Sequence, residues 1–513
     1  MNLIDYSTSA WSVLPPLLAL LLAIFTRRVI ISLSIGIIAG ALMLNNANVT
    51  NSIIYLKNTI LSLVYSENRL NSNNINIILF LILLGILTAL FSISGSNQAF
   101  ASWVKNHIKG KREAKLMAAS LVFFTFIDDY FHSLAVGAIA RPVTDKFKVS
   151  RAKLAYILDS TAAPMCVLMP ISSWGAYIIT LVAGLLATYG ITGYSPLGAF
   201  MTMSAMNLYA IFSIIMVFLV AYYSLDFGPM RRFEQQALLM TESINLNIDQ
   251  NTEGKVRNLI LPIVVLIIGT VTMMMITGNQ ALAENKKTFD ILGAFENTTV
   301  GISLVVGGIS SLITASVLIM IDKKINIKEY ASIYIIGAKS MSGAILILFF
   351  AWTINGIVAD IQTGKYLSSL VADTINPIFL PVILFILGSF MAFSTGTSWG
   401  TFGIMLPIAA AMATNTDPSL LLPSLSAVMA GAVCGDHCSP ISDTTILSST
   451  GAQCNHMVHV TSQLPYALVV ATTTAIGYLI LGLTKSALLS FITTGSLLAI
   501  FIIIVKSKQN KNS

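Results

Sequence analysis

The sequence predicts an all-α polytopic membrane protein, and three observations lead to this prediction. Of the 513 residues, 55% are hydrophobic and only 10% are charged, whereas a soluble chain carries about 25% charged residues. The mean hydropathy is +0.81. About eleven apolar runs are long enough to cross a hydrocarbon core of ~30 Å as helices. Because so few charges cannot cover a water-exposed surface, the composition excludes a nucleic-acid-binding module, a disordered scaffold and a secreted disulfide-rich domain.

A polar insert at 226–257 divides the apolar runs into two groups. The insert is expected to be cytoplasmic and to separate a first transmembrane unit at 1–225 from a second at 258–513. The first run follows an acidic residue and precedes two arginines, which is the wrong order for a cleavable signal peptide. The net charge of +7 indicates basic cytoplasmic loops. The expected transmembrane helices lie near 10–26, 29–44, 75–97, 154–189, 198–223, 258–277, 298–321, 338–358, 420–452, 464–484 and 487–505.

Two further apolar segments are expected to enter and leave the membrane on the same side. The first, near 114–140, lies between two loops rich in Lys and Arg, which favour the cytoplasm. The second, near 376–414, lies between loops almost without basic residues, which indicates the outside. Both are therefore predicted to be re-entrant hairpins, and the two halves of the chain then repeat one order with opposite orientation. Such an inverted-topology repeat with broken helices is typical of secondary transporters, although channels are also built from repeats.

Carboxylates interrupt these apolar segments. An ionised carboxylate at the centre of a bilayer costs about 3 kcal/mol or more, so residues of this kind usually belong to an ion or proton pathway. The aspartates within apolar segments or at their breaks are Asp128, Asp129, Asp159, Asp436 and Asp443.

The first three of these aspartates lie in two local patterns. Asp128 and Asp129 are adjacent midway through the first hairpin, and two adjacent carboxylates repel, so one should hold a proton or neighbour a cation. Asp159 begins the run Asp159-Ser-Thr-Ala-Ala-Pro164. A helix broken by Pro164 would present carbonyls, hydroxyls and a carboxylate, which suit a hard cation such as Na⁺. The alternatives are a solvated hairpin tip and a packing kink that leaves Asp159 in the headgroup region.

The densest polar cluster is Gly431-Ala-Val-Cys-Gly-Asp-His-Cys-Ser-Pro-Ile-Ser-Asp-Thr-Thr445, inside an otherwise apolar span. Gly435 and Pro440 are expected to break the helix there, which is tolerated only where the backbone is buried in protein or lines a cavity. His437 is able either to change charge near neutral pH or to act as a neutral hydrogen-bonding residue. The candidate ion-handling residues of this cluster are Asp436, His437, Ser439, Ser442, Asp443 and Thr444.

Cysteine and hydroxyl residues complete the list of candidates. A Zn²⁺ site would find only three soft ligands here, from Cys434, His437 and Cys438. The stronger interpretation is that the two cysteines pack as small apolar side chains. In the second hairpin, Thr397 and Ser398 lie within a run of small hydroxyl and glycine residues. At a re-entrant tip, this run would bring carbonyl and hydroxyl oxygens close to a ligand. The alternative is close packing of helices through small residues.

These motifs resemble the NhaC family of sodium/proton antiporters, within the wider ion transporter superfamily. The resemblance covers roughly 80–470 and rests most specifically on Gly435-Asp-His-Cys-Ser-Pro-Ile-Ser-Asp-Thr-Thr445 with its continuation to Ser449. It also rests on Phe126-Ile-Asp-Asp-Tyr130, Asp159-Ser-Thr-Ala-Ala-Pro164, Lys339-Ser-Met341 and Ala351-Trp352. The resemblance implies Na⁺/H⁺ exchange by an elevator-like or rocking movement, without covalent chemistry or a cofactor. Its ion-handling residues would be Asp128, Asp129, Asp159, Asp436, Ser439 and Asp443.

The leading hypothesis is exchange of Na⁺ for H⁺ across the bacterial inner membrane, in which both ions compete for the same carboxylates. Na⁺ would be held by Asp159, Asp436 and Asp443. The coordination shell of Na⁺ would be completed by neutral hydroxyl oxygens, which come from Thr397, Ser398, Ser439, Ser442 and Thr444. The expected partners are Na⁺, H⁺ and the lipid bilayer, with no nucleic acid, and a homodimer is left open. The N-terminus is expected outside and the C-terminus in the cytoplasm.

Two other functions compete with this hypothesis. The first is a Na⁺- or H⁺-coupled carrier or exchanger of a small organic acid or amino acid, which the resemblance also includes through malate/lactate exchangers and amino-acid carriers. No arginine stands in the predicted hairpins or broken helices to bind a carboxylate, but helix N-termini are able to do so. The second is an intramembrane aspartyl protease that pairs Asp129 with Asp436. Val433 stands where the protease motif needs Gly, so we expect a transporter and not an enzyme.

Overall fold

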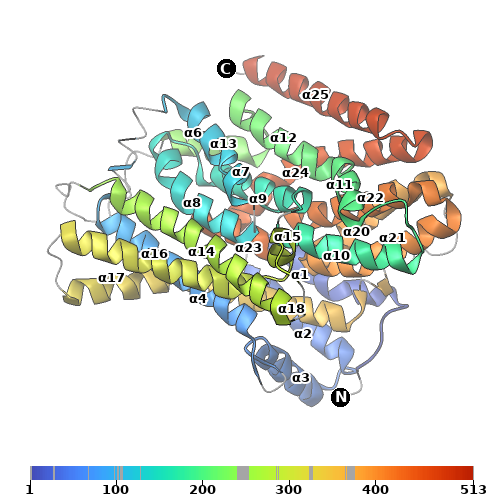
Figure 1. The fold of residues 1–513 in the computed structure, drawn as a ribbon, viewed down its shortest axis with the longest axis horizontal. Coiled ribbons are helices and arrows are strands. Elements are labelled where there is room, and N and C mark those ends of the chain that lie inside the picture. Colours follow the sequence, from blue (N-terminus) through green and yellow to red (C-terminus); the bar gives the residue numbers. More distant parts are fainter. Residues whose placement is uncertain are drawn as a thin grey trace.

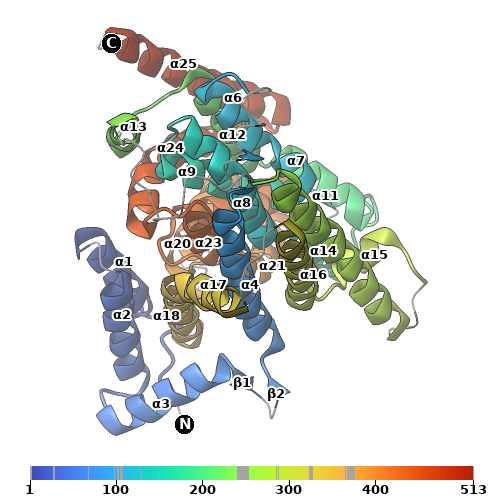
Figure 2. The same ribbon diagram turned by 90° about the vertical axis from the view of Figure 1, so that its left-hand side faces the viewer.

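The computed structural model is built almost entirely from helices (Figure 1). In both views the N-terminal helices α1–α3 and the C-terminal helix α25 lie on opposite sides of the molecule, and α8, α9 and α23 lie between them (Figure 2). This agrees with the predicted all-α polytopic class. The structure describes residues 3–26, 29–66, 69–96, 99–100, 103, 108–126, 129–170, 172–239, 254–284, 286, 288–322, 327–363, 365–366 and 376–511.

The first half of the chain, before the insert, contains two groups of helices. The N-terminal group is η1 (Ala10–Val13), α1 (Leu14–Thr26), α2 (Val29–Leu44), α3 (Val49–Ser62) and α4 (Ser72–Ile93), with a short antiparallel pair β1 (Tyr65–Ser66) and β2 (Arg69–Leu70) before α4. The second group is α6 (Lys111–Ser120), α7 (Val122–Thr125), α8 (Asp129–Lys146), α9 (Arg151–Leu168), α10 (Ser173–Thr188), α11 (Pro196–Ala205) and α12 (Leu208–Tyr223).

The insert and the second half follow. The insert contains the amphipathic helix α13 (Pro229–Leu239). The second half contains α14 (Arg257–Glu284), α15 (Ile291–Glu296), α16 (Val300–Asp322), α17 (Ile327–Ser340), α18 (Ser342–Asp360), η2 (Pro377–Phe379), α20 (Leu380–Thr395), α21 (Ser398–Thr416), η3 (Pro418–Leu420), α22 (Leu421–Cys438), α23 (Asp443–Gly451), α24 (His456–Thr484) and α25 (Ala487–Lys511).

Seven helices in the described part of the chain are long and apolar enough to cross a membrane, or nine if each of two bent helix pairs counts as one span. This count is lower than the expected eleven because several expected spans are short or interrupted helices. The run at 154–189 is divided between α9 and α10, and the run at 10–26 forms only the 13-residue α1 after η1. In the region of the second predicted hairpin, η2 and α20 are together long enough to cross. Whether the two predicted hairpins dip in and return stays a prediction.

The predicted break at Pro440 is where α22 ends, whereas the breaks predicted at Pro164 and Gly435 are displaced. Pro164 was expected to break the first helix, but it lies inside α9, and Gly435 likewise lies inside α22. Both helices end instead at the residue before a later proline. Met169 precedes Pro170 with ψ 122°, and Ser439 precedes Pro440 with ψ 126°. The ring of a proline disfavours helical geometry at the preceding residue, which explains both ends.

The two broken helices match in length and in the sequence that follows them. Helices α9 and α22 have 18 residues each, and α22 begins 270 positions after α9 (421 − 151 = 270). Both are followed by a connector that reads Pro-Ile-Ser, 170–172 and 440–442. The next helices, α10 and α23, begin at 173 and 443, again 270 positions apart (443 − 173 = 270). The two halves of the chain therefore contain a corresponding pair of interrupted helices.

Helices α20 and α22 approach each other through glycines. A Cβ atom on Gly431 would lie 2.3 Å from the carbonyl oxygen of Phe385, and one on Gly435 would lie 2.1 Å from that of Ser389. Real Cβ atoms do not approach other atoms this closely, so the backbones of the two helices are in direct contact. This contact fixes the position of the α22 C-terminus and of the connector after it.

We predict that Gly431→Ala lowers the thermal unfolding midpoint of the purified protein, because its methyl group would push α20 away from α22 at a cost of about 1–3 kcal/mol. The matched control is Gly184→Ala in α10, where a Cβ atom meets nothing within 4 Å. Alanine in that open helical position should leave the midpoint unchanged or raise it, since glycine costs about 0.5–1 kcal/mol in a helix. Equal midpoints for the two variants would contradict the glycine contact.

A buried ion pair connects the insert to the helices of the first half. Glu234 on α13 accepts a hydrogen bond from the backbone nitrogen of Ser150 (2.9 Å) at the start of α9, and it forms an ion pair with Lys111. Lys153 forms a second pair with Asp226 (2.8 Å). Burial opposes ionisation of Glu234, but the nearby Lys153 and Lys111 outweigh it and hold the pKa of this carboxyl below its ordinary value. The insert is therefore attached to α6 and α9 through charge.

We predict that Glu234→Gln lowers the thermal unfolding midpoint at pH 7, because it leaves the buried Lys153 without part of its counter-charge. A depressed pKa stabilises the folded state above the ordinary carboxyl pKa of about 4.3, and this stabilisation is lost as the pH falls through the lowered native pKa. The difference from the parent should therefore shrink in acid. The control is Glu113→Gln on the exposed face of α6. A difference that stays constant with pH would argue against the ion pair.

Candidate functional site

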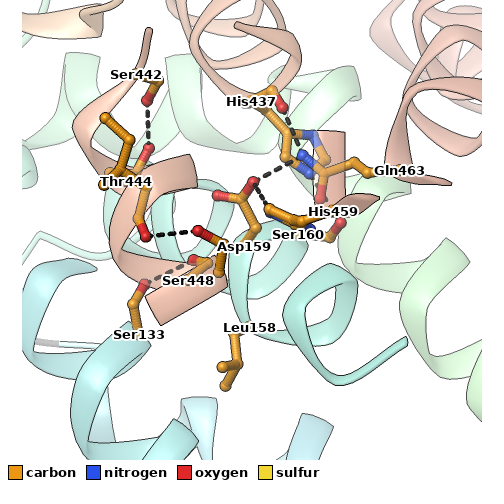
Figure 3. A network of polar contacts seen from close by, with 12 residues as sticks. Ser133, Leu158, Asp159, Ser160, His437, Ser442, Thr444, Ser448, His459 and Gln463 are labelled. Carbon is orange, nitrogen blue, oxygen red and sulfur yellow. Dashed lines mark hydrogen bonds and ion pairs between the residues drawn. The ribbon is translucent and has the colours of Figure 1, made fainter. Parts of the chain in front are cut away.

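Asp159, on the first broken helix, lies in a buried polar network with His459, Gln463 and the His437 backbone at the end of the second (Figure 3). Asp159 lies in the middle of α9 and is 1% exposed. Its Oδ2 atom accepts hydrogen bonds from His459 Nε2 (3.1 Å) and Gln463 Nε2 (2.7 Å), both on α24. Gln463 Nε2 also donates to the backbone carbonyl of His437 (2.6 Å), one residue after Asp436. The amide of Gln463 therefore connects the carboxylate of one broken helix to the end of the other.

The His437 ring is held between two hydroxyl groups. Its Nε2 lies 2.8 Å from Ser160 Oγ and its Nδ1 lies 2.8 Å from Tyr209 Oη. In a neutral imidazole one nitrogen donates and the other accepts, and a hydroxyl group serves either role. Because each hydroxyl oxygen also accepts, the arrangement satisfies a neutral ring and a protonated ring alike, and the choice between the two roles of His437 stays a prediction.

Asp436, also 1% exposed, is bound by the tip between α20 and α21. Its Oδ2 atom accepts from the backbone nitrogen (3.1 Å) and the hydroxyl (2.7 Å) of Ser398, the first residue of α21. The N-terminus of a helix carries partial positive charge, so α21 favours an anion at this position. Gly396 allows the tip to approach, because it has φ +68° and a Cβ atom there would lie 2.7 Å from the carbonyl oxygen of Ile441. The tip therefore lies directly on the connector between α22 and α23.

The first half contains a corresponding contact. Cys166 on α9, 270 positions before Asp436 (436 − 270 = 166), donates from its sulfur to the carbonyl oxygen of Phe126 (3.2 Å). Phe126 follows directly after the last residue of α7, and the predicted tip of the first hairpin comes next along the chain. Asp129 is buried and accepts a hydrogen bond from Trp174 Nε1 (3.1 Å) on α10. Asp128 lies outside the described residues, so its predicted role stays a prediction.

Asp443 connects the second broken helix to the first hairpin. It is half-buried at the start of α23, where its Oδ1 atom accepts from the backbone nitrogen of Thr444 (3.0 Å). Its Oδ2 atom accepts from the hydroxyl of Tyr130 on α8. Farther along α23, Ser448 lies 3.0 Å from Ser133 of α8 (Figure 3). Asp443 is thus held by the first half of the chain.

The predicted hydroxyl residues lie around the tip and the connector. Ser439 Oγ donates to the carbonyl oxygen of Phe393 (2.8 Å), and Ser442 Oγ lies 2.8 Å from Thr444 Oγ1. The carbonyl oxygen of Thr397 accepts from Thr401 Oγ1 (3.1 Å). Of these candidates, Ser398 and Ser442 interact with the carboxylate of Asp436. In the described part of the chain, no three His, Cys, Asp or Glu side chains are grouped to hold a metal ion. A bound Na⁺ would therefore also need neutral oxygens.

Sequence reasoning missed the contribution of α24. A stripe of four buried polar side chains follows this helix at intervals of three, four and three residues, which places them on one face: His456, His459, Gln463 and Tyr466. The two central residues bind Asp159. The outer two donate to the backbone carbonyls of Pro440 (2.7 Å) and Leu225 (2.9 Å). The spacing of the stripe was the available signal, since polar residues at helical intervals within an apolar span indicate a face turned into the protein.

Three buried oxygen atoms in this network have no hydrogen-bond partner among the described residues: Asp159 Oδ1, Asp436 Oδ1 and Gln463 Oε1. A buried polar atom left unsatisfied costs about 1–3 kcal/mol, and more when it is charged. A proton on a carboxylate oxygen removes this cost, and so does a small hard cation, which binds through oxygen lone pairs. The arrangement is therefore suited to holding either ion.

The comparisons with known proteins agree with this chemistry. The model of the Na⁺/H⁺ antiporter family matches residues 165–483. A Haemophilus influenzae protein described as uncharacterized is 66% identical over 508 residues, which cover 99% of this chain and 98% of the relative. The malate-2H⁺/Na⁺-lactate antiporter of Bacillus subtilis is 28% identical over 159 residues, 30% of this chain and 33% of the relative. A second Haemophilus influenzae protein, an uncharacterized Na⁺/H⁺ antiporter, is 34% identical over 109 residues, 21% of this chain and 23% of the relative.

The family match covers more than half of the chain and includes both α22 and α24. It confirms the resemblance derived from the motifs, and it indicates a transporter rather than an enzyme. Together with the long apolar helices, it identifies a multi-pass membrane protein that performs cation/proton antiport or related transport. The chain belongs to the Na⁺/H⁺ antiporter family.

Proposed function

We propose that this protein is a secondary active transporter that exchanges Na⁺ for H⁺ across the bacterial inner membrane. The single observation that carries the proposal is the pair of buried carboxylates Asp159 and Asp436, each with one oxygen that no donor in the described part of the chain satisfies. They lie on different broken helices and are joined through Gln463 and the His437 carbonyl. Na⁺ and H⁺ each satisfy a carboxylate oxygen, so binding of one expels the other. That competition is the basis of antiport.

The other candidate residues have supporting roles in this proposal. Ser398 holds Asp436 through its hydroxyl and backbone nitrogen, so movement of the α20–α21 tip changes the surroundings of the carboxylate. Asp443 and Tyr130 connect α23 to α8, and Asp129 and Trp174 connect α8 to α10. A change at either broken helix is thereby passed to the other half of the chain. Proton and cation occupancy would in this way bias the position of the helices.

The proposal includes an inverted-topology repeat, with units at 1–225 and 258–513 separated by the insert at 226–257. Supporting observations are the equal lengths of α9 and α22, their Pro-Ile-Ser connectors, and the contacts of Phe126 with α9 and of Ser398 with α22. The N-terminus would lie outside and the C-terminus in the cytoplasm. Assembly as a homodimer is compatible with this arrangement.

A second candidate function is Na⁺- or H⁺-coupled transport of a small organic acid. It is favoured by a cavity of about 290 Å³, a volume larger than one bare ion needs. The cavity is lined by Ser340, Met341, Ile446, Ser449, Thr450, Gln453, Cys454 and His456. His456 connects this cavity to the connector after α22 through the Pro440 carbonyl. The similarity to a malate/lactate antiporter supports the same candidate.

Transport in proteoliposomes with a preformed pH gradient tests the leading function. We expect external NaCl to collapse the gradient, as followed by an internal pH-sensitive dye, because Na⁺ entering the site displaces a proton. KCl should leave it intact, since the smaller Na⁺ fits an oxygen site with few ligands better. If neither salt has an effect, the Na⁺/H⁺ function is wrong, and cation-stimulated uptake of labelled malate, lactate or amino acids tests the second candidate.

In the same assay, Asp159→Asn and Asp436→Asn should each reduce Na⁺-driven proton flux at least about 30-fold. This corresponds to losing about 2 kcal/mol of interaction with the ion, because an amide neither binds a proton nor attracts a cation by charge. Asp145→Asn is the control, since Asp145 pairs with Arg151 at an exposed position. Size-exclusion profiles identify any variant that fails to fold. Wild-type flux in a folded Asp436→Asn protein would remove Asp436 from the proposed site.

A further inference from the structure

The orientation of the Gln463 side-chain amide is fixed by its two neighbours. Its Nε2 atom lies 2.7 Å from Asp159 Oδ2 and 2.6 Å from the His437 carbonyl oxygen. An ionised carboxylate and a carbonyl oxygen only accept hydrogen bonds, so the NH₂ group must face both. The other end of the amide, Oε1, is then directed away from these two acceptors. It is buried and has no hydrogen-bond partner among the described residues.

The unsatisfied Oε1 atom belongs to a set. Oδ1 of Asp159, which Gln463 binds, and Oδ1 of Asp436, the residue before the His437 carbonyl that Gln463 binds, are also unpaired among the described residues. The three oxygens come from α24, α9 and α22. Buried polar atoms in folded proteins are nearly always paired, and these three oxygens are acceptors that a positive group would satisfy; Nδ1 of His459, which binds Asp159, is likewise unpaired among the described residues. A hard cation coordinates carboxylate and amide oxygens alike, and an amide adds a ligand without adding charge.

We propose that Gln463 determines the cation affinity and selectivity of the site: its Oε1 atom contacts the transported cation while its Nε2 atom holds Asp159 against the end of α22. This inference rests on the proposed cation transport. The carboxylates supply the charge that H⁺ and the cation compete for. The Gln463 amide supplies a neutral oxygen that the cation uses and the proton does not need. Loss of this oxygen should therefore weaken cation binding more than proton binding.

The same amide links the cation to the helices. If Asp159 moved away from the end of α22, Nε2 would lose one of its two acceptors, and Oε1 would turn with it. Cation binding at Oε1 thus stabilises the arrangement in which α9, α22 and α24 are in contact. A purely structural amide would support the fold without distinguishing one cation from another, which provides the test.

The experiment compares Gln463→Met with Gln236→Met, the same change at an exposed glutamine of α13. Methionine retains the shape of glutamine but has no amide. Na⁺-driven and Li⁺-driven proton flux are measured in proteoliposomes to give KM and the maximal rate for each cation. The rise in thermal unfolding midpoint caused by NaCl, relative to choline chloride, reports cation binding without transport. We expect Gln463→Met to raise the KM for Na⁺ roughly tenfold, to change the Na⁺/Li⁺ ratio and to reduce the NaCl-dependent rise in midpoint.

The possible results separate this inference from the proposed function. If the wild-type protein shows neither cation-driven flux nor a NaCl-dependent midpoint, the proposed function fails, and the role of Gln463 fails with it. If the wild type shows both and Gln463→Met retains the parent KM and Na⁺/Li⁺ ratio, the inference alone is overturned, even where the maximal rate falls. If Gln463→Met does not fold, Gln463→Leu takes its place, because leucine is also uncharged and also lacks the amide oxygen. A KM and ratio within twofold of the parent in that variant would equally overturn the inference.

Discussion

Burial of Asp159 is the constraint around which the rest of the site is arranged. A carboxylate in the middle of a buried helix must have its charge offset by hydrogen bonds, by a proton or by a cation. Among the residues that the structure describes, only one of its oxygens has hydrogen-bond partners, His459 and Gln463. These partners come from α24, and their own position depends on the end of α22, where Gln463 finds its second acceptor. The three helices are therefore held together by a carboxylate whose charge the protein has offset only in part.

The helix breaks make this arrangement available. An unbroken helix satisfies its carbonyl groups within itself, whereas a helix that ends inside the protein leaves carbonyls for other partners. Pro440 ends α22 one residue earlier, at Ser439, and the His437 carbonyl becomes an acceptor for Gln463. The same ending leaves room for the glycine turn at Gly396, which brings the start of α21 and Ser398 to Asp436. One local rule of proline geometry thus positions both a carbonyl and a carboxylate.

Local chemistry explains which features the sequence made predictable. Isolated aspartates in apolar runs are conspicuous because their burial is costly, so Asp159, Asp436 and Asp443 were identified without a structure. The positions of the breaks were less certain, because proline is tolerated inside a helix when neighbouring groups compensate for its missing donor, as the helical Pro164 shows. Gln463 and His459 were missed for a different reason. Each is about 300 residues away from Asp159 along the chain, and no local pattern encodes such a pairing.

The corresponding positions of the two halves carry different chemistry, so the proposed function would use one site and not two. Asp436 corresponds to Cys166, and Asp159 corresponds to Met429, each 270 positions apart. Where one half offers a carboxylate, the other offers a thiol or a thioether, both weakly polar and well suited to packing. Each half therefore contributes one charged group at a different depth of its broken helix. The carboxylates come from opposite halves and are joined through α24, so a shift between the halves changes the distance between the two charges. A site divided in this way responds to relative movement of the halves, whereas two complete sites, one in each half, would not.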